Sequence, residues 1–272
     1  MGLSWFEQEL ESSFHTILEN GTRDFMKYVE ATVFTTKPLK DKEKALQYFT
    51  ALEQRGFFLN KVGLYEPVRQ PYSLEVGIDV WTHEEAGCYV DGVGMVGKAG
   101  GMIGKSTKPR FFVQTQWWEC PDQVNLNWVS LNIAENIAEK SHEAIIALFK
   151  GSVEILNADY GFIGYQDTVH RQHVTGTLKT RLPGVFWFNY FGPKYVEFFT
   201  ENKIKAFPWF SIEQLNGGLI ASLSDSPKKL LDNDELEKAA KEHLGSDSFG
   251  DVDEYLKNPR TEQRRRVPDW SR

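Results

Sequence analysis

The stretch that comes nearest to a chemical motif is the glycine-rich segment Ala99-Gly-Gly-Met-Ile-Gly-Lys-Ser106. It fits a relaxed phosphate-loop pattern, in which backbone N–H groups hold a phosphate and the lysine adds a positive charge. Such a loop needs a buried strand before it and a helix directly after it. Here Pro109 follows closely and Arg110–Trp118 has an extended pattern, so no helix is expected there. Gly92–Gly97 has the spacing of a dinucleotide-binding loop and fails for the same reason. A nucleotide-binding enzyme that uses loop 92–106 is therefore kept only as the alternative interpretation.

Two histidines and three carboxylates are the other candidates for chemistry. On a helix, the spacing of His170 and His173 would bring both rings near one face, where they could bind a metal ion. Their segment is polar and no nearby Cys or Glu completes a ligand set, so we interpret them as surface histidines. Asp79, Glu84 and Glu85 have no partner nucleophile in a recognisable pattern. The sequence therefore predicts a protein that is not an enzyme and has no cofactor and no metal site.

The charge balance restricts the kinds of partner. The 272 residues include 38 Asp and Glu against 31 Lys and Arg, a net charge of −7. Direct nucleic-acid binding is not expected, because phosphate affinity needs clustered basic residues. Residues 225–254 hold ten Asp or Glu against four Lys, whereas the last residues carry Arg264, Arg265 and Arg266. The acidic balance favours a basic partner.

The cysteines and the N-terminus indicate a compartment. Two cysteines, Cys88 and Cys120, suggest no disulfide framework and make no zinc motif, which fits a reducing compartment. The N-terminal residues show no basic region followed by an apolar block, so no signal peptide is expected. No apolar run approaches the length that spans a bilayer. The sequence predicts a soluble, cytoplasmic protein with no membrane partner.

The densest apolar signal is Val185-Phe-Trp-Phe-Asn-Tyr-Phe191, bounded by Pro183-Gly184 and Gly192-Pro193. The run lacks alternation and is too short for a helix, so it predicts a central strand buried on both faces. A buried Asn must satisfy its amide, and we expect Asn189 to bond a neighbouring loop.

Helical and extended patterns alternate along the rest of the chain without a regular βαβ order. Apolar stripes predict helices at Leu3–Leu18, Asp41–Gln54 and Ser141–Leu156, whereas Leu74–Trp81 is ambiguous. Seven glycines in Gly87–Gly104 predict a flexible loop. These patterns indicate an α+β fold with a mixed or mostly antiparallel sheet and helices packed on it, and they leave open a division into two subdomains.

The domain organisation follows from the composition. We expect a single domain over residues 1–272, with an α+β core at 28–212. An acidic helical part follows at 213–257, and a loose basic tail at 258–272.

Several segments together resemble the bacterial Immunity protein 52 family of polymorphic toxin systems. They are Val62-Gly-Leu-Tyr-Glu-Pro67, Trp117-Trp118, Asn127-Trp128, Tyr160-Gly-Phe-Ile163 and Leu182-Pro-Gly-Val-Phe-Trp-Phe-Asn-Tyr-Phe-Gly192. The resemblance covers roughly residues 28–212 and implies a protein that neutralises a cognate toxin. The family's toxins are often delivered by contact-dependent or type VI secretion and often resemble restriction endonucleases. The resemblance implies no catalytic residues, and a general protein-interaction module remains a further alternative.

Two groups of charged residues are candidates for the toxin contact. One is the acidic helix start with Asp232, Asp234, Glu235 and Glu237, although acids at a helix N-terminus also stabilise the helix itself. The other is the glycine-rich segment with Lys98 and Lys105, because long loops often carry function. The sequence does not decide whether inhibition would block the toxin's active site or its assembly. The oligomeric state is open, with a monomer expected in the toxin-bound form.

Overall fold

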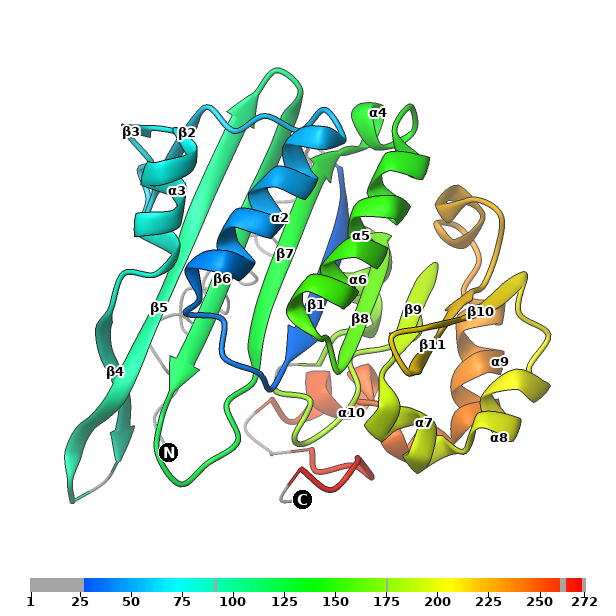
Figure 1. Ribbon diagram of the computed structural model, residues 1–272. Helices are drawn as coiled ribbons and strands as arrows, with labels where there is room; N and C mark the ends of the chain where they lie inside the picture. Colours follow the sequence, from blue (N-terminus) through cyan, green and yellow to red (C-terminus); the bar gives the residue numbers. More distant parts are fainter. Residues whose placement is uncertain (1–26, 91, 175, 260–262, 271–272) are drawn as a thin grey trace.

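One antiparallel sheet of 11 strands is the framework of the computed structural model, which describes residues 27–90, 92–174, 176–259 and 263–270. The strands are β1 (Tyr28–Thr35), β2 (Lys61–Gly63), β3 (Gln70–Pro71), β4 (Glu85–Val90), β5 (Gly94–Thr107), β6 (Arg110–Glu119), β7 (Asn127–Ala134), β8 (Tyr160–Tyr165), β9 (Phe188–Phe191), β10 (Ser211–Leu215) and β11 (Gly218–Ser222). Their order is β10-β11-β9-β8-β1-β7-β6-β5-β2-β3, and β4 pairs with β5. The α+β class is confirmed (Figure 1).

The helices lie against this sheet and near its β10–β11 edge. They are α2 (Lys42–Gln54), α3 (Leu74–Trp81), α4 (Glu135–Ala138), α5 (His142–Leu156), α6 (Gln166–Gln172), α7 (Pro193–Phe199), α8 (Glu201–Ala206), α9 (Glu235–Leu244) and α10 (Val252–Lys257), with short 3₁₀ turns at Pro227–Leu230 and Ser246–Ser248. Helices α2 and α5 lie side by side over one face of the central strands (Figure 1). The helix expected over Leu3–Leu18 falls outside the described residues.

The predicted patterns explain the central layers. Asp41 caps α2 by accepting hydrogen bonds from the N–H groups of Glu43 and Lys44, so the helix starts where the sequence indicates. Along β6, residues at alternate positions from Phe111 to Trp117 are buried under the helices, and those between them are half-buried. Strand β1 lies between β7 and β8, where Val33 pairs with Val129 on one side and Gly161 on the other.

The aromatic run forms a shorter strand than predicted. Only Phe188–Phe191 is β9, although Val185, Phe186 and Trp187 are also buried. The Asn189 side chain accepts a hydrogen bond from the Phe186 N–H at 2.8 Å and donates one to the Phe186 carbonyl at 2.7 Å. Those two bonds hold the backbone before β9 in a bend. Asn189 thus satisfies its amide in the neighbouring loop, as expected for a buried asparagine.

The glycine-rich segment is not a flexible loop, which corrects the prediction for Gly87–Gly104. It forms most of β4 and β5, and β5 pairs with β6 from Lys98 to Thr107. A Cβ at Gly100 would lie 2.2 Å from the indole ring of Trp117, so the glycine allows a tryptophan to pack directly on the strand. The ambiguous segment Leu74–Trp81 is the helix α3, which the Ser73 hydroxyl caps.

The described end of the chain is held to the core and differs from the loose tail expected at 258–272. The Trp270 ring is buried against Tyr195, with ring centres 5.8 Å apart, and its N–H donates to the Leu178 carbonyl at 3.1 Å. The side chain of buried Gln263 donates a hydrogen bond to the Asp251 carbonyl, and the Gln263 backbone carbonyl accepts one from the Arg181 guanidinium. Aromatic burial and these bonds fix residues 263–270.

Candidate interaction surface

The acidic candidates gather at the start of α9 beside a shallow pocket of about 470 Å³. Arg171 and the run 231–235 line that pocket. Asp232 and Glu235 are exposed, and Asp234 pairs with Lys238 one turn later at 2.8 Å. The hydrogen bond from Lys238 lowers the pKa of Asp234. This is the arrangement of a helix start stabilised by its own acids.

Glu237 does not belong to the surface, which corrects its proposal as a toxin contact. Its side chain is 1% exposed and accepts two hydrogen bonds from the Arg171 guanidinium, at 2.8 and 3.1 Å. Arg171 also donates to the Leu231 carbonyl at 2.8 Å. Burial raises the pKa of Glu237 to about 7, outweighing the opposite effect of Arg171. The pair is an internal clamp that joins α6 to α9.

The two candidate lysines lie on β5 and are both engaged in ion pairs. Lys98 contacts Glu84 at 2.6 Å, and Lys105 contacts Glu66. Hydrogen bonds from Lys40 and Lys98 lower the pKa of Glu84 to about 2. Both lysines sit in extended backbone, so the segment does not form a phosphate loop. β5 and α9 lie toward opposite ends of the sheet, so the structure does not bring the six candidates together (Figure 1).

His170 and His173 are half-buried, which corrects their interpretation as surface histidines. Burial lowers the pKa of His173 to about 4, and the neighbouring charges of Arg181 and His170 act in the same direction. Among the described residues, no cluster of three or more His, Cys, Asp or Glu side chains could hold a metal ion.

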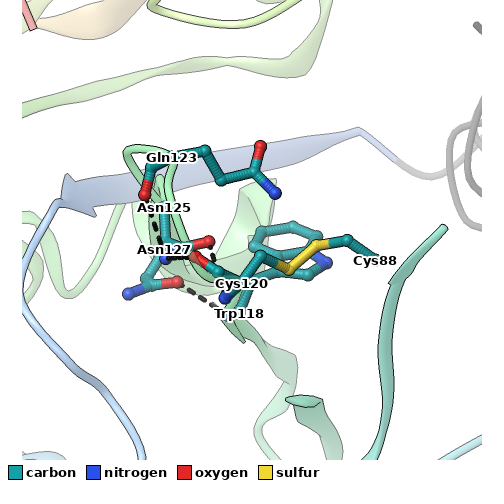
Figure 2. Close-up of a disulfide and its surroundings, with 6 residues drawn as sticks. All are labelled: Cys88, Trp118, Cys120, Gln123, Asn125 and Asn127. Atoms are coloured by element: carbon teal, nitrogen blue, oxygen red, sulfur yellow. Dashed lines mark hydrogen bonds between the residues drawn. A yellow bond between two sulfur atoms is a disulfide. The ribbon is translucent and has the colours of Figure 1, made fainter. Parts of the chain in front are cut away.

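A disulfide joins Cys88 of β4 to Cys120, which directly follows β6, whereas the cysteine count suggested no disulfide framework. The two Cα atoms are 6.0 Å apart. An Asn125 side chain fixes the Cys120 backbone by donating to its carbonyl and accepting from its N–H, each at 3.1 Å (Figure 2). The Asn127 side chain accepts a hydrogen bond from the Trp118 N–H at 2.8 Å (Figure 2). Side-chain amides therefore fix the backbone at Trp118 and at Cys120.

Among the described residues, the most exposed apolar side chains lie at the tip of the hairpin formed by β4 and β5, and sequence reasoning missed them. Tyr89 and Val93 are each 70% exposed, Met95 is 55% exposed and Val90 is 40% exposed. The signal was present in the sequence, because Asp-Gly between apolar residues is a strong hairpin signature. The seven glycines of Gly87–Gly104 instead favoured the interpretation of the whole segment as a flexible loop.

Comparisons with known proteins support the fold and go no further. No family model matches the chain, and no curated protein matches it. A solved structure, Pseudomonas aeruginosa T6SS protein PA0821, is similar over 97% of this chain and 88% of its own length, with a TM-score of 0.55 and 11% identity. At that identity the likeness is one of fold. In the described residues, no helix has the length and apolar character to cross a membrane.

Proposed function

We propose that this protein binds and neutralises a toxin effector of a polymorphic toxin or type VI secretion system, and so protects the cell that produces it. The observation that carries the proposal is a fold shared along almost the whole chain with a T6SS protein. The resemblance of residues 28–212 to the Immunity protein 52 family points in the same direction. That family remains an expectation, since no family model matches.

The proposed action is stoichiometric binding, without a reaction. The expected toxin is a nuclease that resembles restriction endonucleases, and such an enzyme needs a basic surface to hold nucleic acid. A net charge of −7 would attract that surface over a distance and speed the encounter. Exposed aromatic and apolar side chains, with Tyr89 and Val93 foremost, would then supply the contact energy.

The place of action follows from the target. A nuclease toxin reaches nucleic acid in the cytoplasm, so we place the inhibitor there. The Cys88–Cys120 disulfide argues against a cytoplasmic location, because disulfides are rare in cytosolic proteins and persist in oxidising compartments.

The test uses the toxin encoded beside this gene. The untagged toxin should co-purify with the tagged protein, and nucleic-acid cleavage should stop once the inhibitor reaches an equimolar amount. Cells that express the toxin should survive only when this protein is also expressed. A protein that neither binds this toxin nor rescues growth would refute the proposal.

A further inference from the structure

The hairpin of β4 and β5 extends past the end of its neighbouring strand. The pairing of β5 with β6 begins at Lys98 and Glu119. The outer pairs of the hairpin join Cys88 to Val96, Tyr89 to Met95 and Val90 to Gly94, and they lie beyond that point. In the described part of the chain, this outer half therefore pairs only with itself, and it projects from the body of the protein (Figure 1).

The disulfide shows that this projection is held in a fixed direction. Strands separated by a third strand lie about 9.5 Å apart in a flat sheet, which is beyond disulfide reach. The 6.0 Å between the Cα atoms of Cys88 and Cys120 requires the hairpin to fold over the end of β6. Gly97 allows that fold, because its φ is +67° and a Cβ there would lie 2.3 Å from the Glu119 carbonyl oxygen. A two-stranded hairpin is only marginally stable alone, so the tether provides the order.

The tip presents four exposed apolar side chains to solvent. A tight turn, closed by a 3.0 Å hydrogen bond from the Val93 N–H to the Val90 carbonyl, brings the two strands together. Tyr89, Val90, Val93 and Met95 then surround this turn. Single exposed apolar residues are ordinary, but several together mark an interaction site. A rigid convex tip loses little conformational entropy when it enters a concave surface.

The charges near the base of the hairpin indicate which kind of surface that is. Glu119 and Asp122 are exposed beside it, whereas the nearby Lys98 is paired with Glu84. This acidic base disfavours the anionic lipid surface of a membrane. It also disfavours a second copy of a chain whose net charge is −7. A protein whose apolar cleft has a basic rim complements both the tip and the base.

We infer that the disulfide-tethered hairpin, described at residues 88–90 and 92–96, inserts its apolar tip into an apolar, basic-rimmed cleft of the toxin. This inference rests on the proposed function and names the contact element for it. The candidates Asp232, Asp234 and Glu235 lie elsewhere and are not needed for this contact. Insertion into a cleft would inhibit by occupying the surface that the toxin uses for nucleic acid.

The experiment compares substitutions at the hairpin tip with a substitution of another exposed apolar residue, Phe210. The variant Tyr89→Ser/Val93→Ser removes the apolar tip, and Met95→Ser provides a second tip variant. Phe210→Ser is the matched control, because Phe210 is 63% exposed beside β10 at the other edge of the sheet. Each disulfide-bonded protein is checked for an unchanged urea midpoint and titrated with the toxin encoded beside this gene. The double tip variant should bind about 100-fold more weakly or worse, as for the loss of a hot spot, while Phe210→Ser binds like the native protein.

The outcomes separate this inference from the proposed function. Native protein that does not bind the toxin would overturn both. Native binding that the tip variants retain, or that Phe210→Ser abolishes, would overturn the inference alone. Two further measurements test other occupants of the tip: binding to phosphatidylcholine–phosphatidylglycerol vesicles, and self-association by sedimentation. If either occurs in the native protein and is lost in the tip variants, the tip serves a membrane or a second copy, and the inference is wrong.

Discussion

At the scale of single residues, the Arg171–Glu237 clamp shows how burial changes the meaning of a charged side chain. Glu237 stands in an acidic run whose other members face water, yet it is 1% exposed and bound to a residue 66 positions earlier. Removing a carboxylate from water is costly even beside an arginine. That cost is the reason why the pKa of Glu237 is raised to about 7.

The raised pKa predicts a pH-dependent stability that Glu237→Gln should remove. The contribution of this group to the unfolding free energy is fully present below its ordinary pKa of 4.5 and is lost as pH rises through about 7. Relative to Glu237→Gln, the native protein should lose up to about 3 kcal/mol between these limits. Urea unfolding of both proteins at pH 5 and pH 8 measures the difference. A native protein that gains stability over the variant as pH rises would instead assign the dominant effect to the ion pair.

At the scale of elements, β9 and its buried approach form the apolar centre between β8 and β11. Trp187 is 2% exposed, and its indole N–H donates to the Ser224 carbonyl at 2.9 Å. Replacing it by Ala should lower the unfolding free energy by about 3–5 kcal/mol, because the cavity cannot collapse completely. Urea unfolding gives this value, and protection should fail through loss of folded protein.

The control for Trp187→Ala is Phe210→Ala, which removes an exposed ring and should change stability by less than about 0.5 kcal/mol. A Trp187→Ala protein that stays stable yet no longer binds the toxin would place this segment at the contact and contradict its role in the core.

Local patterns predicted the elements well, and contacts between distant segments explain where they did not. Helix α5 and strand β6 each carry their period in adjacent residues, so both were predictable. The glycines of β5 indicate a loop when they are considered alone. They form a strand because Trp117 and Glu119, on another strand, occupy the space of the missing side chains. The assignment of Glu237 to the surface was wrong for the same reason, since its carboxylate is buried against Arg171 of α6.

At the scale of the whole molecule, the compartment in which the protein acts can be tested through its two thiols. A reducing cytoplasm would leave both Cys88 and Cys120 free to react with a membrane-permeant maleimide added to intact cells, whereas a hairpin that keeps its disulfide tether would react at neither. Mass spectrometry of the rapidly denatured protein counts the labels, with a fully reduced sample as reference. Unlabelled, disulfide-bonded protein from the same cells would place this protein, and the proposed toxin binding, in an oxidising compartment.

The position of β1 in the sheet delays the point during synthesis at which the sheet can be completed. The first strand of the sheet fits between β7 and β8, so residues 28–35 must wait for residues 127–134 and 160–165 before both of their edges are paired. Contacts across such a separation close slowly. A ribosome that adds ~5–20 residues per second needs about 6–26 s to proceed from residue 35 to residue 165. A fully paired β1 therefore appears only after that interval, so under the proposed function a cell exposed to the toxin would depend on protein that it made beforehand.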